Sequence, residues 1–409
     1  MDIFRVLIIE DDMEGWAKPM KGQLQLLYPE LICDIAVDVQ TAKRYLARKR
    51  YHFISFDQHL PEQAGDQVTT LFGVQLVRQI KATHPLIGGY IYTAYGQKDN
   101  KILLGKGKYA FQYVDKHEVP AKQWAKKVGD WLQRNYWSFY FDSGQNVLPP
   151  PLVETAGFLH KTNAQDQAVQ WIGYFIDFWE VVLRLSWAQT MGLARHLGQS
   201  IPVTQQGQSH AVIQILQESI PRLAQQGRLC CWNPYLGAQG EDQGWQGLKA
   251  LDSLHQLRND QVYVKTPEDW SGFIAQFSEH TLSLTDLAAF WADFPLISFN
   301  QNGSHNIIAG SAYPFAQSTD QLLMPDETTP EHVFVTWRDA DDQPSLIDLW
   351  PYMKLRWHPA LNRFTLCIVS HYQPQKPHNM WYETNLQNAR KQPFKPDPTE
   401  ESILLGQAE

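Results

Sequence analysis

Short apolar runs alternate with amphipathic stretches along the first third of the chain. The runs are Phe4–Ile9, Ile32–Ala36, His52–Phe56, Gly89–Thr93 and Phe111–Val114. Between them, apolar residues recur at helical spacing in Trp16–Leu27, Val39–Lys49, Val74–Ala82 and Ala121–Arg134. Strands that alternate with helices build a parallel sheet with helices packed on its faces. Residues 1–135 are therefore predicted to form an α/β domain with five parallel strands.

The pattern changes several times after this domain. The stretch 136–163 contains DSGQNVLPPP, in which turn formers and three prolines oppose a continuous helix, and we expect a linker there. In 164–293 apolar residues recur at helical spacing, which predicts an all-helical domain. Residues 294–390 carry short β-type runs between turn formers and predict a small β-rich region. The polar, proline-rich stretch 391–409 is expected to be a flexible tail.

The overall composition is that of a folded, cytoplasmic protein. Of 409 residues, 44% are apolar and 19% are charged, far from the low hydropathy and high charge of disordered chains. No run of 18 apolar residues occurs, and the start MDIFRVLIIEDD lacks the basic flank and small-residue cleavage site of a signal peptide. We therefore expect no membrane segment and a cytoplasmic location.

The charge of the chain is unevenly distributed. Residues 1–135 carry 19 Lys and Arg against 15 Asp and Glu, whereas residues 136–409 carry 16 against 28. Nucleic-acid binding gains most of its affinity from basic residues that neutralise phosphates. The acidic downstream part therefore argues against nucleic acid as a partner. It also contains no short helix-turn-helix segment with a basic recognition helix, so a transcription regulator is the least favoured class.

Polar residues follow the strand-like runs of the first domain. Glu10 and Asp11 end the first run, Asp57 the third, Thr93 the fourth and Lys116 the fifth. The carboxyl ends of parallel strands meet at one edge of the sheet, so these side chains are expected to lie close together. Phosphoryl transfer to a carboxylate needs a nucleophilic Asp, a divalent cation and donors for the remaining charge. The pattern predicts such a site.

The segments around these residues resemble the receiver domain of two-component response regulators, a CheY-like, flavodoxin-like (βα)5 fold. VLIIEDD resembles the first strand and acidic pair of that family, and FISFDQHLP its phosphoacceptor signature D-x-x-L-P. IYTAYG resembles its Thr-Ala strand, and YVDKHE its lysine strand. The four motifs occur in the order of the family and cover roughly one third of the chain.

The resemblance implies a phosphoacceptor and a metal site. Asp57 would accept a phosphoryl group from a histidine kinase. Glu10, Asp11 and Asp57, together with the main chain of His59, would hold Mg²⁺, a cation that prefers oxygen ligands. Residues EQAGDQVTTLF, which follow the phosphoacceptor signature, are extra relative to the family and are expected to lengthen the loop beside this site.

The resemblance also implies a switch. Lys116 and Thr93 would bind the phosphoryl oxygens, and the Thr93 hydroxyl would move toward the phosphate. Tyr113, the aromatic residue three positions before the lysine, would turn inward in response. Thr93 and Tyr113 are therefore the candidate switch pair. We expect no enzymatic activity of this domain beyond phosphoacceptance and autodephosphorylation.

The helical region carries one motif of its own, GLKALDSLHQLRNDQVY, in which leucines form an apolar helix face that ends at Arg258 and Asn259. It resembles the L-R-N-x-x-x-H helix of HEPN-type helical domains. In nucleases of that group an Arg and a His five residues later cleave RNA, but Tyr263 occupies the second position here. Because tyrosine does not titrate near neutral pH, a structural or binding role is favoured over catalysis.

The sequence as a whole predicts a Mg²⁺-dependent response regulator whose helical output region does not bind DNA. Its expected partners are a histidine kinase and either a protein effector or a second copy of the chain. The alternative that stays open is a receiver-gated HEPN-type ribonuclease or defence effector, supported by Arg258 and Asn259. A transcription regulator is third.

Overall fold

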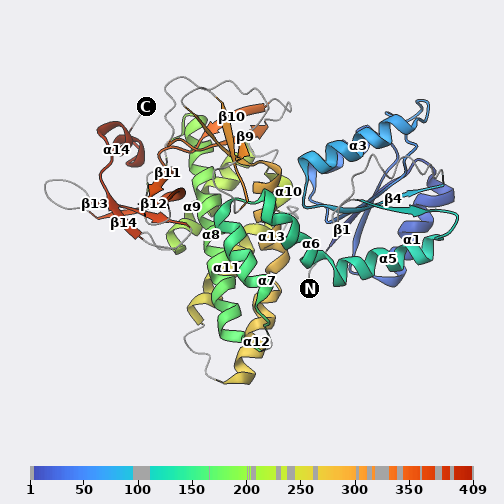
Figure 1. The fold of residues 1–409 in the computed structure, drawn as a ribbon, viewed down its shortest axis with the longest axis horizontal. Helices are drawn as coiled ribbons and strands as arrows, with labels where there is room; N and C mark the ends of the chain where they lie inside the picture. The colour runs from blue at the N-terminus through green and yellow to red at the C-terminus, as the bar shows by residue number, and fades with distance from the viewer. Residues whose placement is uncertain are drawn as a thin grey trace. The chain divides into compact units, whose positions relative to one another are not determined.

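Two compact units make up the protein in a computed structural model (Figure 1). The first comprises residues 1–144 and 233–237, and the second comprises 145–232 and 238–409. None of the helices among the described residues is long and apolar enough to cross a membrane. The structure describes residues 4–94, 111–164, 166–199, 201, 203, 209–226, 232–236, 245–260, 266–300, 304–310, 316–317, 331–338, 344–359, 362–373, 380–386 and 391–407.

The first unit contains a five-stranded parallel sheet, as the sequence predicts. Its strands are β1 (Arg5–Ile9), β2 (Ile32–Ala36), β3 (Phe53–Phe56), β4 (Gly88–Thr93) and β5 (Gln112–Asp115). They lie in the order β2-β1-β3-β4-β5. The direction in which strands are added therefore reverses at β1, which pairs with β2 on one side and β3 on the other. In open α/β sheets, the crevice beyond the carboxyl ends at this point is where ligands bind.

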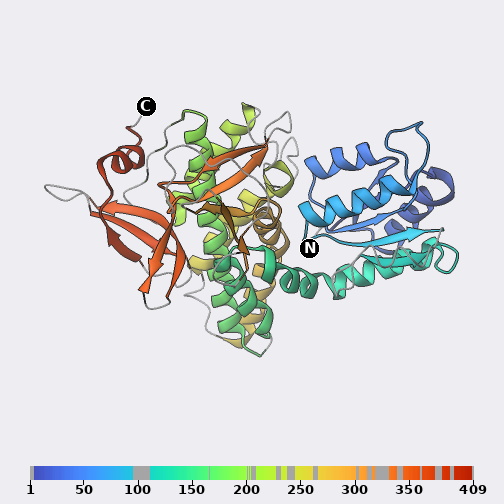
Figure 2. The ribbon, with the colours of Figure 1, turned by 45° about the horizontal axis from the view of Figure 1, so that its top comes forward.

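Helices cover both faces of this sheet (Figures 1 and 2). On one face, α2 (Val39–Arg48) and α3 (Thr70–Thr83) enclose an apolar core with alternate residues of the strands. The other face carries the π-helix η1 (Met13–Ala17), α1 (Lys18–Leu27) and α5 (Ala121–Arg134). Because side chains alternate between the faces of a strand, each buried strand supplies residues to both layers.

The α5 face of the sheet is unusually aromatic. Phe53 of β3 lies edge-on to Tyr90 of β4 and to Trp131 of α5, with ring centroids 4.9 and 5.1 Å apart. The indole N–H of Trp124 donates a hydrogen bond of 3.0 Å to the Ser55 hydroxyl, which satisfies two polar groups inside this layer. The regular spacing of the α5 tryptophans therefore reflects core packing.

The stretch 136–163, where we expect a linker, instead contains α6 (Tyr136–Val147) and α7 (Pro150–Lys161). Pro149 is the residue before α7, and Pro150 and Pro151 are its first two helical positions. At the start of a helix the N–H groups have no partner within the helix, so a proline costs little there. The prolines thus begin a helix in place of an extended linker. The domain boundaries themselves stay a prediction.

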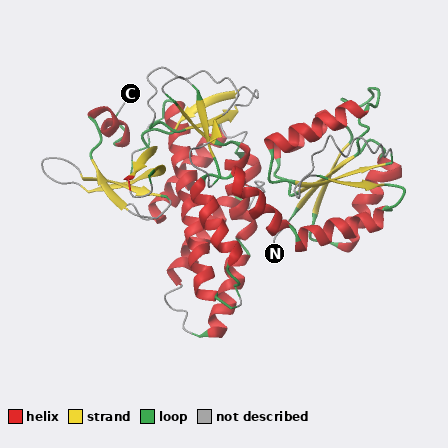
Figure 3. Ribbon diagram, viewed as in Figure 1, coloured by secondary structure: helices red, strands yellow, loops and turns green. Residues whose placement is uncertain are grey.

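The second unit begins with helices, in agreement with the predicted helical region (Figure 3). The long α8 (Ala168–His196) is buried nearly all round in its second half, as expected for a helix at the centre of a domain. The indole N–H of Trp179 on α8 donates to the Leu251 carbonyl of α11 at 3.2 Å. The other helices are α9 (Ser209–Gln225), α11 (Gln246–Asp260), α12 (Pro267–Ser278) and α13 (Thr281–Asp293); α10 (Asn233–Leu236) belongs to the first unit.

Two antiparallel sheets follow the helices. The first has the order β10-β9-β6-β7-β8 and the second the order β11-β12-β13-β14. Strands of the first are β6 (Leu296–Phe299), β7 (His305–Ile308), β8 (Ala316–Gln317), β9 (Phe334–Arg338) and β10 (Pro344–Asp348). Strands of the second are β11 (Met353–His358), β12 (Arg363–Gln373), β13 (Met380–Asn385) and β14 (Lys391–Phe394). The described part of the chain therefore agrees with the predicted β-rich region.

The stretch 391–409, expected to be a flexible tail, contains β14 and α14 (Pro398–Leu404). Lys354 of β11 forms a buried ion pair with Glu400 of α14. The Trp381 indole donates to Glu401 at 2.9 Å, and Leu404 is fully buried. The polar, proline-rich composition does not reveal these contacts, because their partners Lys354 and Trp381 lie outside the stretch. Proline at the first position of α14 is compatible with a helix start.

Candidate metal and phosphoryl site

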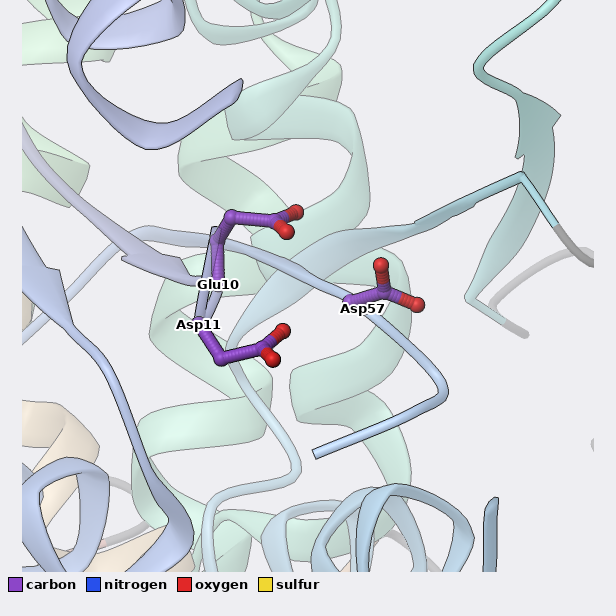
Figure 4. Close-up of side chains that lie close together, drawn as sticks. All are labelled: Glu10, Asp11 and Asp57. Carbon is purple, nitrogen blue, oxygen red and sulfur yellow. The ribbon is translucent and has the colours of Figure 1, made fainter. Parts of the chain in front are cut away.

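Three carboxylates converge at the carboxyl edge of the parallel sheet. Glu10 and Asp11 follow β1, and Asp57 follows the neighbouring strand β3. Figure 4 shows Glu10 and Asp11 projecting from the end of β1 toward Asp57. One oxygen of each residue lies within 4.8 Å of the others. The two strand ends are fixed to each other because the Asp57 N–H donates to the Ile9 carbonyl at 2.9 Å.

Lys116, after β5, places its ammonium group between two of these carboxylates. Its Nζ atom lies 2.6 Å from Glu10 Oε2 and 2.5 Å from Asp57 Oδ2, and the residue is 3% exposed. The Lys116 N–H donates to the carbonyl of Thr93, the last residue of β4, at 3.0 Å. The structure therefore brings together every residue that the sequence places at these strand ends.

Burial and the neighbouring negative charge raise the pKa values of Glu10 and Asp11. Burial raises the pKa of Glu10 to about 8; the Lys116 ammonium acts in the opposite direction, and the Asp57 carboxylate adds to the rise. The pKa of Asp11 is also raised, chiefly by burial, with a contribution from Asp57. A bound cation would offset the repulsion between these carboxylates, so the site favours an added positive charge.

The donor set fits a small divalent cation. Mg²⁺ and similar hard cations prefer carboxylate and carbonyl oxygens, and this is the only cluster of three or more His, Cys, Asp or Glu ligands within the described residues. The main chain at His59 lies beside the same group, since its N–H donates to Asp57 Oδ1 at 3.1 Å. A cation bound by Glu10, Asp11 and Asp57 would neutralise the oxygens of a phosphoryl group at Asp57.

Two aromatic rings cover the lysine. The Lys116 Nζ atom lies 5.1 Å from the ring centre of Trp16 in η1 and 5.8 Å from that of Tyr92 in β4. The two rings pack edge to face, 5.7 Å apart. Sequence analysis missed Trp16 in this role, because it stands at the start of an amphipathic stretch and reads as a core residue. Only its position five residues after Asp11 hinted at the site.

The two candidate switch residues lie on neighbouring strands. Tyr113 of β5 is opposite Ile91 of β4, and Thr93 is two residues further along β4. Residues two apart on a strand share a face, so Thr93 and Tyr113 are diagonal neighbours on one face of the sheet. Thr93 is fully buried and Tyr113 half-buried. Burial raises the pKa of Tyr113, and the charges of Asp115 and then Asp57 add to that rise.

The extra residues after the phosphoacceptor signature form a closed loop. Leu60 and Thr69 pair as an isolated antiparallel bridge, with both N–H···O distances 3.2 Å. Gly65 has a φ of +95° at the turn, a conformation that other residues rarely adopt. The N–H of Val39, the first residue of α2, donates to the Pro61 carbonyl at 3.2 Å. The loop beside the site is thus fixed to the start of α2.

The residues predicted for a possible output site belong to the second unit. Arg258 and Asn259 are near the end of α11, and Tyr263 lies outside the described residues. Arg258 donates to the Ser209 hydroxyl of α9 at 3.3 Å, and Asn259 Nδ2 lies 3.2 Å from His255 Nε2. Sequence analysis missed His255, although its position three before Arg258 places both on one side of the helix.

Comparisons with known proteins bear on the first third of the chain. No protein-family model and no curated protein matches the chain. The solved CheY-like response regulator receiver domain protein from Methanospirillum hungatei JF-1 is 19% identical over 32% of this chain and 95% of that chain, with a TM-score of 0.27. The receiver domain of a DNA binding response regulator from Colwellia psychrerythraea 34H is 21% identical over 32% of this chain and 99% of that chain, with a TM-score of 0.26. The Mn²⁺-bound form of response regulator Rcp1 is 16% identical over 32% and 96%, with a TM-score of 0.26.

Proposed function

We propose that the chain is a response regulator of two-component signalling and that a histidine kinase phosphorylates Asp57 with the help of Mg²⁺. One observation carries the proposal: the Asp57 carboxylate lies within a cluster of acidic metal ligands and also contacts the Lys116 ammonium. A nucleophile, a cation site and a positive donor are the parts that phosphoryl transfer to a carboxylate requires.

In the proposed reaction, an Asp57 oxygen forms a bond to phosphorus while the bond from phosphorus to the donor atom breaks. Glu10, Asp11 and Asp57 would hold the cation, which would supply positive charge to the phosphoryl oxygens. Lys116 exchanges its contact with the Asp57 carboxylate for one with a phosphoryl oxygen. Thr93 contributes a hydroxyl donor from the neighbouring strand, and its movement allows Tyr113 to turn inward.

The proposed output is a change in protein contacts. The acidic charge of residues 136–409 favours a protein effector, or a second copy of the chain, over nucleic acid. The charge added by phosphorylation would shift the equilibrium between two arrangements of Thr93 and Tyr113. We keep the cytoplasm as the proposed location.

Intact-mass spectrometry after incubation with acetyl phosphate and Mg²⁺ tests the phosphoacceptor. We expect one added phosphoryl group on the full chain, none on Asp57→Asn, and an unchanged adduct on Asp66→Asn, which alters an exposed aspartate of the nearby loop. Light scattering on the same samples reports self-association. An adduct that survives Asp57→Asn, or no adduct under any condition, would rule out the assignment.

The second candidate is a receiver-gated ribonuclease of HEPN type, in which the second unit would act as a defence effector. The observation in its favour is that Arg258 and Asn259 lie beside His255, whose imidazole could serve as a general acid or base. Phosphorylated protein should then cleave single-stranded RNA, and Arg258→Ala should abolish cleavage. Intact RNA after incubation with fully phosphorylated protein would remove this candidate.

A further inference from the structure

Two histidines and an arginine meet where the start of α9 lies against the end of α11. The rings of His210 and His255 are stacked, with centroids 5.6 Å apart and planes 29° apart. Arg258, three residues after His255, donates to Ser209, the residue before His210. We call His210, His255 and Arg258 the His-Arg cluster. Its members come from segments far apart in the sequence, so only the packing of the two helices creates it.

Arg258 contacts a hydroxyl group and an aromatic ring. Its guanidinium uses Nη1 for the bond to the Ser209 hydroxyl and lies 5.9 Å from the ring centre of Trp179 on α8. No carboxylate pairs with Arg258 in the part of the chain that the structure describes. A guanidinium has five N–H donors in a planar fork, so this arrangement orients the group while leaving donors for a ligand.

The surroundings of His255 disfavour its charged form and leave one ring nitrogen without a described partner. Its pKa is lowered first by burial and then by the positive charges of His210 and Arg258, while Asp252 acts weakly in the opposite direction. Its Nδ1 atom is buried and has no hydrogen-bond partner among the described residues. α8 contributes the uncharged indole of Trp179, whose ring centroid lies 6.2 Å from that of His255. The cluster is therefore short of negative charge and of an acceptor.

We infer that the His-Arg cluster binds an anion of the phosphate class. A phosphate group carries several acceptor oxygens and negative charge, so it could accept hydrogen bonds from the guanidinium fork and from the N–H groups of both imidazole rings at once. His210 is exposed, which leaves the cluster accessible.

The inference goes beyond the phosphorylation of Asp57 and does not depend on it. It is therefore tested on the full-length, unphosphorylated chain. Inorganic phosphate is titrated at constant ionic strength, with chloride as the balancing anion, while the histidine ring resonances are followed by NMR on histidine-labelled protein. We expect saturable shifts for His210 and His255, a rise in the pKa of His255, and tighter binding at pH 6 than at pH 8, because the anion favours the charged ring.

Variants decide whether the cluster is the site. Arg258→Gln should weaken phosphate binding at least about tenfold, because a charged hydrogen bond is lost. The phosphate affinity of Arg258→Lys should lie between those of the wild type and Arg258→Gln. Arg222→Gln is the matched control, since it removes an exposed arginine of α9 outside the cluster. Phosphate binding that is unchanged in Arg258→Gln, or shifts that do not saturate, would overturn the inference.

A second arm identifies the source of the phosphate group. A labelled single-stranded oligoribonucleotide is titrated against the same proteins by fluorescence anisotropy. Binding that Arg258→Gln weakens would support the cluster as a site for the backbone of RNA, whereas phosphate binding without RNA binding would support a small phosphorylated ligand. If neither probe binds, the inference is wrong, even where Asp57 still accepts a phosphoryl group.

Discussion

The ammonium group of Lys116 lies 5.1 Å from the centre of the Trp16 ring, so an aromatic side chain covers the lysine that bridges Glu10 and Asp57. The face of an indole ring attracts a cation electrostatically, and the attraction grows when water is excluded. Trp16 is thus placed to hold Lys116 in the site while the carboxylates around it change partners. Its own helix, η1, begins just after the acidic pair Glu10 and Asp11, so the same end of β1 leads to the carboxylates and to the ring that contacts Lys116.

Replacement of Trp16 by leucine is expected to slow phosphorylation of Asp57. A cation–π contact of this kind is worth about 0.5–2 kcal/mol, which corresponds to a loss of about twofold to thirtyfold in rate. Trp16→Phe keeps an aromatic face and should lose less. The rate of adduct formation with acetyl phosphate, followed by intact mass, measures both. Equal rates for the wild type and Trp16→Leu would show that the ring does not position the lysine.

The affinity of the site for Mg²⁺ should depend on pH through Glu10. The pKa of Glu10 in the metal-free protein is raised to about 8, so below that pH the carboxyl holds a proton that the cation must displace. The dissociation constant is therefore expected to fall about tenfold for each unit of pH up to about pH 8 and then to level off. Calorimetric titrations of the full chain at several pH values measure the slope.

Glu10→Gln is the control for this dependence. An amide cannot release the proton, so the variant should bind Mg²⁺ more weakly at pH 8.5 and lose most of the slope. An affinity of the wild type that stays constant between about pH 6 and pH 8 would contradict the assignment of Glu10 as a ligand that titrates in this range.

Gly73 permits a close approach that an alanine would block. A Cβ atom at Gly73, in the first turn of α3, would lie 2.1 Å from the carbonyl oxygen of Gln58, the residue after Asp57. We expect Gly73→Ala to destabilise the first unit by about 1–3 kcal/mol and to slow the proposed phosphorylation, because the main chain beside Asp57 must move. Thermal denaturation and adduct formation are the measurements.

Gly22→Ala provides the matched comparison for Gly73→Ala. Gly22 is also inside a helix of the first unit, but a Cβ atom there would meet nothing within 4 Å. Alanine is therefore expected to raise stability by about 0.5–1 kcal/mol through its higher helix propensity. Similar melting temperatures for the two variants would show that the contact with Gln58 is unimportant.

The ion pair between Lys354 and Glu400 should fix α14 to the second sheet of its unit. Lys354→Met leaves the Glu400 carboxylate buried without a partner, and breaking such a pair costs about 3–5 kcal/mol. The double variant Lys354→Met/Glu400→Leu replaces both charges by apolar groups and should recover most of the loss. Hydrogen exchange in the α14 peptide measures local opening; fast exchange in the double variant as well would mean that packing, and not charge, is at fault.

Much of the first unit could be predicted from sequence, because its strands are short, buried runs that end in polar residues. The sites of Glu10, Asp57 and Lys116 follow from topology alone: all parallel strands point the same way, so their carboxyl ends share one edge. No detailed packing is needed for that argument. The regular spacing of buried residues likewise made the helical region predictable, including the long helix α8.

What sequence could not supply depends on side chains that meet through packing. Trp16 has the same pattern as any apolar residue on an amphipathic helix, and only its distance to Lys116 separates it from the core. His210 and His255 lie on different helices, and no spacing rule links them. The three prolines at 149–151 are equally consistent with a linker and with a helix start, and the polar stretch around Glu400 shows its buried partner only in three dimensions.

The closed loop after Asp57 has a mechanical consequence. Its backbone is bonded to the first turn of α2 at two places, through Val39 to Pro61 and through Gln40 to Glu62, with N–H···O distances of 3.2 and 3.1 Å. A displacement of the chain just beyond Asp57 would therefore be transmitted to the start of α2. Phosphorylation of Asp57 would then change two surfaces of the first unit, one at Thr93 and Tyr113 and the other at α2.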